Sequence, residues 1–115
     1  MKWVMHSNKK ILYQDYTNLN GDKIAELIPI FTYLKLQYKE IDRLQLLNFT
    51  NSYGTKPALN ALSEAARVTK HLYTKTAVLG MTGVKKILLN MLNRITSIGA
   101  KAFATEEKAK NWLIS

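Results

Sequence analysis

The sequence contains no cysteine, which excludes disulfide bonds, thiolate nucleophiles and cysteine-ligated metal sites. It has only two prolines and five glycines in 115 residues, a composition unlike that of collagen-like or low-complexity chains. No apolar run approaches the roughly 20 residues that span a bilayer. Near the amino terminus the only apolar run is Trp3 to Met5, too short for the core of a signal peptide. We therefore expect a cytoplasmic protein without a membrane span.

Acidic side chains are scarce as well, with eight Asp and Glu against 17 Lys and Arg, so the formal net charge is +9. A strong positive charge favours acidic partners. The basic residues are nevertheless scattered, and the longest runs are the pairs Lys9-Lys10 and Lys85-Lys86, a pattern typical of a solubilising surface. With 47% hydrophobic residues the chain has enough apolar side chains for one core, and we expect a single domain over residues 1–115.

Hydrophobic periodicity predicts strands that alternate with helices. Strands are expected at residues 3–6, 11–16, 43–50, 76–80 and 100–104. Helical spacing of apolar residues is found over 24–38, 58–73, 84–95 and 109–113. The first two strands are joined by a short polar turn and should pair antiparallel. The pattern therefore predicts an α/β fold, with a mostly parallel sheet of about five strands, an N-terminal antiparallel hairpin, right-handed crossovers and four helices.

A family resemblance is carried by the C-terminal half of the chain. The residues concerned are the stretch 76–83, Asn93 with Thr96 near the end of the third helix, and the stretch 103–107 followed by Ala109, Trp112 and Leu113. With the order of elements, they resemble the small STAS proteins, domains similar to the anti-sigma factor antagonists and to the STAS portions of sulphate transporters. The resemblance implies a STAS-like fold and a non-enzymatic regulatory or protein-interaction module, with phosphorylation at the start of the second helix.

The loop that corresponds to the phosphorylated segment is Asn51–Thr55. Its candidate phosphoacceptors are Ser52 and Thr55. Asn51 stands where antagonists of this kind have an acidic residue, and the usual serine-glycine pair is absent. A hydroxyl side chain at the start of a helix also serves as an N-cap, which is the alternative role for both residues.

A second loop has the composition of an anion or ligand site. Gly80, Thr82 and Gly83 stand at the predicted start of the third helix, where Thr82 is expected to be the N-cap, and Lys85 and Lys86 follow. Phosphate loops have four residues between their glycines and a Lys-Ser or Lys-Thr after the second glycine. This loop has two intervening residues and no hydroxyl after the lysines, so it is kept as a candidate for a small anion only.

No arrangement of residues predicts catalysis or metal binding. His6 and His71 belong to different predicted elements, and the pair Glu106-Glu107 is explained by the favourable dipole at a helix start. A nucleophile, a base and an orienting residue cannot be assembled. We therefore expect no catalytic residues, no metal and no cofactor.

Binding is thus the expected function, and three kinds of partner remain open. A protein partner or a second copy would use apolar residues that point away from the predicted core, namely Ile30, Tyr33, Leu36 and Leu89. A small apolar ligand or lipid would occupy a pocket under the first helix, which we expect Pro29 to kink. Nucleic acid is disfavoured because no recognition motif is present. Its backbone-binding face would consist of Lys70, Lys75, Lys85, Lys86, Lys101, Lys108 and Lys110, with Tyr53 or Tyr73 for stacking.

Overall fold

The computed structural model describes residues 1–115. Its strands are β1 (Lys2–His6), β2 (Lys9–Asp15), β3 (Arg43–Asn48), β4 (Tyr73–Leu79) and β5 (Lys101–Phe103). Its helices are α1 (Gly21–Gln37), α2 (Lys56–Thr69), the short 3-10 helix η1 (Lys70–Leu72), α3 (Val84–Thr96) and α4 (Glu106–Leu113). None of these helices has the length and hydrophobicity needed to cross a bilayer.

The five strands form one sheet in the order β1-β2-β3-β4-β5. Strands β1 and β2 pair antiparallel, and all the other pairs are parallel, which confirms the predicted mostly parallel sheet and N-terminal hairpin. The hairpin turn is shorter than the predicted 7–10 because only Ser7 and Asn8 connect the strands. Both have positive φ, at 49° and 67°, as in the two-residue turns that match strand twist.

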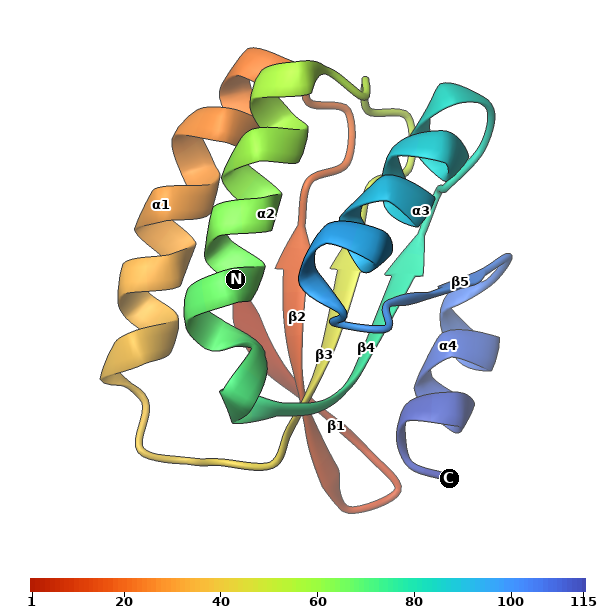
Figure 1. The fold of residues 1–115 in the computed structure, drawn as a ribbon. Helices are drawn as coiled ribbons and strands as arrows, with labels where there is room; N and C mark the ends of the chain where they lie inside the picture. Colours follow the sequence, from red (N-terminus) through yellow and green to blue (C-terminus); the bar gives the residue numbers. More distant parts are fainter.

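The helices cover both faces of the sheet, three on one side and one on the other (Figure 1). The crossover helices α1, α2 and α3 share one face, as expected when successive parallel strands are joined by crossovers of the same hand. Helix α4 packs on the opposite face, where Ala109 and Leu113 contact a small core with Ile11, Leu46 and Ala77. The larger core lies under α1, α2 and α3.

The side of α3 that packs on the core differs from the one predicted from the sequence. The predicted inward stripe was Val84, Ile87, Leu88, Met91, Leu92 and Ile95. In the structure Leu88, Leu89 and Leu92 pack on the larger core, while 59–64% of Val84, Ile87 and Ile95 is exposed and Met91 is exposed as well. Leu89, predicted as an interface residue, is only 7% exposed, so that prediction was wrong.

Side-chain contacts at the end of α3 explain this rotation. The Asn93 amide donates to the carbonyl of Ala100 (2.9 Å) and accepts from its backbone N–H (2.8 Å). Buried Thr96 donates to the carbonyl of Leu92 at 2.7 Å. The two Asn93 bonds tie this side of the helix to the segment that enters β5, whereas the Thr96 bond lies within α3. The periodicity alone does not show them, because α3 carries two apolar stripes of similar strength.

One close backbone approach restricts the turn after β4. Gly80 has φ +79°, and a Cβ atom there would lie 2.5 Å from the backbone nitrogen of Thr50. The turn lies beside the loop that follows β3, so the two carboxyl-end loops pack directly on each other. Only glycine fits this position without displacing Thr50.

Replacing Gly80 with alanine tests this packing. We expect Gly80→Ala to lower the free energy of unfolding by about 3 kcal/mol, because backbone strain is added to a backbone clash. Gly99→Ala is the matched control, since Gly99 also has positive φ (+68°) but has open space where Cβ would lie. The control should lose only about 1 kcal/mol. Urea unfolding measures both, and equal losses would contradict the close approach.

Candidate functional site

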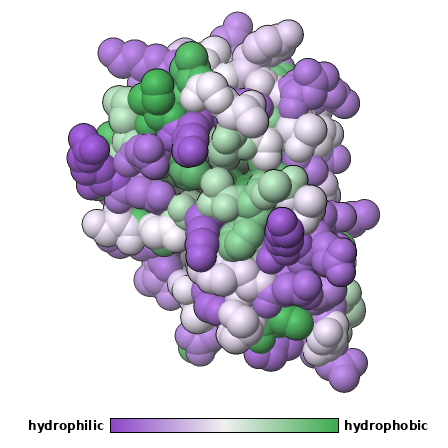
Figure 2. Space-filling view, turned by 90° about the vertical axis from the view of Figure 1, so that its right-hand side faces the viewer, coloured by the Kyte–Doolittle hydropathy of each residue, from purple (hydrophilic) through white to green (hydrophobic).

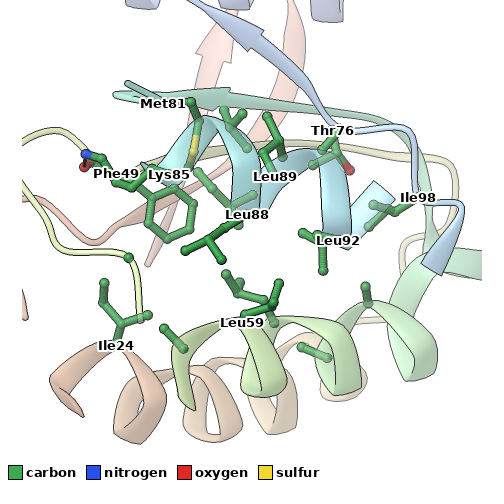
Figure 3. A pocket seen from close by; sticks show the side chains of 18 of the residues that line it. Ile24, Phe49, Leu59, Thr76, Met81, Lys85, Leu88, Leu89, Leu92 and Ile98 are labelled. Carbon is green, nitrogen blue, oxygen red and sulfur yellow. Dashed lines mark hydrogen bonds between the residues drawn. The ribbon is translucent and has the colours of Figure 1, made fainter. Parts of the chain in front are cut away.

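A cavity of about 70 Å³ lies between helices α2 and α3 and the face of the sheet that these helices cover. Its walls are mostly hydrophobic. In Figure 3 Leu88 and Leu92 on α3 point across the cavity toward Leu59 on α2. For comparison, an apolar cavity of about 150 Å³ holds a benzene molecule, and one water needs about 10–15 Å³. The cavity therefore has room for a short aliphatic group without any movement of the helices.

The predicted pocket position was only partly right. The sequence placed an apolar pocket under the first helix, at its proline kink. The structure places the cavity mainly between α2 and α3, and α1 reaches it only through Ile24 and Lys35. Helix α1 itself continues through Pro29 from Gly21 to Gln37.

One end of the cavity is closed by the loop after β3 and the start of α3. Lys85 donates from Nζ to the carbonyl of Phe49 at 2.9 Å (Figure 3). Burial lowers the pKa of Lys85 below its usual value. Gly54 packs against Leu88, because a Cβ atom at Gly54 would lie 2.6 Å from Leu88 Cδ1. Lys85 thus connects the start of α3 to the loop that follows β3.

The two candidate phosphoacceptors both have structural contacts. Ser52 is 6% exposed and donates its hydroxyl to the carbonyl of Phe49 at 2.6 Å. Thr55 is the N-cap of α2, and its hydroxyl oxygen accepts from the backbone N–H of Ala58 at 3.3 Å. The capping role is therefore confirmed for Thr55. Phosphorylation of either residue stays a prediction.

The candidate anion loop does not converge on one point. Gly83 is the N-cap of α3, with φ 57° and no side-chain cap, so the prediction that Thr82 caps this helix was wrong. The Thr82 carbonyl instead accepts from the backbone N–H of Lys85 at 3.2 Å. The Lys85 side chain is bound to Phe49, whereas Lys86 is exposed.

A row of hydrogen-bonded polar side chains crosses the face of the sheet that α1, α2 and α3 cover. The Tyr16 hydroxyl donates to Gln14 Oε1 (3.1 Å), Gln14 Nε2 donates to Gln45 Oε1 (2.8 Å), and Gln45 Nε2 donates to Thr76 Oγ1 (2.8 Å). All four residues are at most 3% exposed, and burial raises the pKa of Tyr16. Gln45 and Thr76 line the cavity, so its sheet side has polar groups among apolar walls.

This row of side chains is absent from the sequence-based predictions, although the strands contain a signal for it. Gln14 and Gln45 stand inside predicted strands, at positions that alternate with residues of the opposite face. Polar residues at buried strand positions need partners inside the protein. The pairing of β2, β3 and β4, which supplies those partners, is visible only in the structure.

A buried lysine also lines the cavity, at the end near the C-terminus of α1. Lys35 is in the last turn of α1, is 5% exposed, and forms no hydrogen bond or ion pair. Its Nζ lies 5.7 Å from the centre of the Tyr73 ring. Burial, with a smaller effect of the nearby Arg43 charge, lowers the pKa of Lys35 to about 8. Nothing in the sequence marks Lys35 as buried, because a lysine between Leu34 and Leu36 resembles an ordinary residue on a helix surface.

Arg43 is buried beside Lys35 but has partners. Its guanidinium donates to the carbonyls of Lys35 (2.8 Å) and Tyr38 (2.7 Å), and also to that of Glu40. These carbonyls belong to the end of α1 and the segment after it, where unpaired acceptors are left by a helix terminus. Arg43 therefore has a structural explanation, which Lys35 lacks.

The remaining candidate residues are dispersed. His6 contacts Asn111 (Nε2 to Oδ1, 2.9 Å), His71 is exposed, and no three His, Asp or Glu side chains come together. Ile30, Tyr33 and Leu36 are exposed on α1, as predicted. Three of the seven lysines considered for nucleic acid donate to main-chain carbonyls, namely Lys70, Lys75 and Lys85. These three ammonium groups are therefore engaged within the protein.

Comparisons with protein-family models, curated proteins and solved structures find no match to this chain.

The lowered pKa of Lys35 predicts a specific dependence of stability on pH. Between about 8 and the usual value of 10.5 the unfolded chain binds more protons than the folded one, so the free energy of unfolding rises with pH in this window. Lys35→Met removes the buried charge. We expect it to be more stable than wild type at neutral pH, by on the order of 3 kcal/mol, and the difference to vanish as pH approaches the unfolded pKa.

Urea unfolding at several pH values measures this difference. The control is Lys39→Met, which removes a lysine from an exposed position just beyond α1 and should leave the pH dependence of wild type unchanged. If Lys35→Met shows the same pH dependence as wild type, Lys35 is not a buried, weakly solvated cation.

Proposed function

We propose that this protein is a non-catalytic binding module that takes a small, largely apolar ligand into the cavity between the sheet and helices α2 and α3. The observation that carries the proposal is the cavity itself, which lies inside the larger core and combines apolar walls with the polar groups of Gln45 and Thr76. Ligand sites generally have this composition, since apolar surface supplies affinity and a few polar groups fix orientation.

Ligand entry would be through a movement of α3. Helix α2 packs far more extensively on α1 than on α3, so the seam between α2 and α3 is the easier one to open. The outer side of α3 is not covered by another element, because Val84, Ile87 and Ile95 are exposed. An outward shift of α3 would enlarge the cavity for a longer chain.

Filling the cavity tests the proposal. Hexanol is the probe, and binding is followed by amide NMR shifts of residues that line the cavity. We expect wild type to bind hexanol and Leu92→Trp to lose binding, because the larger side chain occupies the space that faces Leu59. Ile95→Trp places the same side chain on the exposed side of α3 and should bind like wild type. No shifts in wild type, or equal binding by both variants, would refute the proposal.

A second candidate function is the one that the STAS resemblance implies, a regulatory or protein-interaction module. The helix and strand order supports a STAS-like fold, with Thr55 at the start of the helix after the central strand. The specific observation in its favour is an exposed apolar stripe on α3. Its residues, called the outer α3 stripe, are Val84, Ile87, Met91 and Ile95.

The surface around this stripe is mixed. Figure 2 views the side of the molecule where α3, β5 and α4 lie, and it shows hydrophobic patches separated by hydrophilic side chains. Small apolar patches with polar surroundings are found at protein interfaces as well as on ordinary surfaces. A protein-interaction role can be tested with this protein alone if the partner is a second copy of the same chain.

Analytical ultracentrifugation over a range of concentrations provides that test. If the outer α3 stripe mediates self-association, wild type should form a dimer that is weakened at least about tenfold by the double substitution Ile87→Ser and Ile95→Ser, which removes apolar surface. The matched control is Ile30→Ser with Tyr33→Ser, since these residues are equally exposed on α1. A monomer at all concentrations, or a dimer broken only by the control, would exclude this role of the stripe.

A further inference from the structure

The charge inside the proposed ligand cavity is of one sign. Among the residues that line it, the only charged ones are Lys35 and Lys85, and none is acidic. Lys85 already donates to the carbonyl of Phe49. Lys35 Nζ donates to nothing, although the residue is 5% exposed. Burying most of a lysine side chain with no protein acceptor for its ammonium is unfavourable, because hydration is reduced and not replaced by a protein partner.

The surroundings of Lys35 do not supply a counter-ion. Arg43 on β3 adds a second positive charge, and Tyr73 at the start of β4 presents its ring to Nζ at 5.7 Å. The acidic residue next along the chain, Glu40, is on the surface and pairs with Lys10 at 3.4 Å. The end of α1 and the Tyr73 ring compensate the Lys35 charge only in part, since Arg43 already occupies the carbonyls there.

One more polar atom without a partner lies near Lys35, although its residue does not line the cavity. The Thr32 hydroxyl, one turn before Lys35 on α1, is buried and has no hydrogen-bond partner. In folded proteins nearly all buried polar groups have partners, and exceptions often mark a missing bound group. Thr32 lies on the same helix as Lys35, one turn earlier.

We propose that the ligand of this cavity carries a carboxylate, which accepts a hydrogen bond from Lys35 Nζ at the α1 end of the cavity while its aliphatic part lies between α2 and α3. This inference rests on the proposed ligand-binding function and makes it more specific. The carboxylate would be the counter-ion that Lys35 and Arg43 lack, and charge-assisted hydrogen bonds of this kind are stronger than neutral ones. The apolar walls suit the chain of a short aliphatic carboxylate, and the outward shift of α3 described above makes room for it.

A matched pair of probes separates the carboxylate from the chain. Hexanoate and hexanol have the same carbon chain and differ in the polar end. Titration of each at neutral pH, followed by amide NMR shifts, should show that wild type binds hexanoate at least about tenfold more tightly than hexanol. Lys35→Met should lose this preference and keep its affinity for hexanol. Lys39→Met, with the same change in net charge at an exposed position, should keep the preference.

Each outcome has a defined meaning. If wild type binds neither probe, both the inference and the proposed function fail. If wild type binds both equally, or if Lys35→Met keeps the preference for hexanoate, the carboxylate inference fails and the apolar ligand site stands. Lys35→Gln is the second variant, because it keeps a polar end without charge and should also lose the preference.

A pH titration provides an independent check on the same complex. The pKa of free Lys35, lowered by burial to about 8, predicts that wild type loses affinity for hexanoate as the ammonium is deprotonated, whereas affinity for hexanol stays constant. Burial raises the pKa of the neighbouring Tyr73 to about 12, so its hydroxyl does not titrate with Lys35. A hexanoate affinity that does not change with pH would overturn the role of Lys35.

Discussion

Burial of β3 on both faces is the constraint on which the rest of this structure depends. Leu46 faces the small core under α4, and its neighbour Leu47 faces the larger core under α1, α2 and α3. Most residues of this strand are buried, so each buried polar side chain on it needs a partner inside the protein. Arg43 and Gln45 follow this rule, one through carbonyls at the end of α1 and the other through Gln14 and Thr76.

The candidate site lies where this rule is broken. Beside the satisfied row of Gln14, Gln45 and Thr76, the core contains an unfilled space and the unpartnered ammonium of Lys35. Natural proteins tend to depart from close packing and from polar satisfaction where they bind something. Because the cavity and the lysine occur together, one occupant with an apolar chain and an anionic end would satisfy both departures.

The sequence predicted the class of fold well and the details of the site poorly. Hydrophobic periodicity identified every strand and all four longer helices, because each segment buries one side and the spacing of its apolar residues follows the helical or strand repeat. Leu89 on α3 was placed outside, however, since this helix has two apolar stripes and the bonds of Asn93 to Ala100 that select between them form only in the folded structure. Lys35 was overlooked for a related reason: the end of α1 is covered by Arg43 and Tyr73, which are distant in the sequence.

Local sequence thus determined four features of the fold, because periodicity, turn residues and helix caps act over a few neighbouring residues. These features are the order of elements, the hairpin, the parallel sheet and the capping of α2 by Thr55. The tertiary structure alone decided the rotation of α3, the pairing of Gln14 with Gln45, the position of the cavity and the burial of Lys35. Each of these depends on packing between segments that are distant in the chain. Such packing is set by shape and by the satisfaction of buried polar groups, and no pattern within one segment records it.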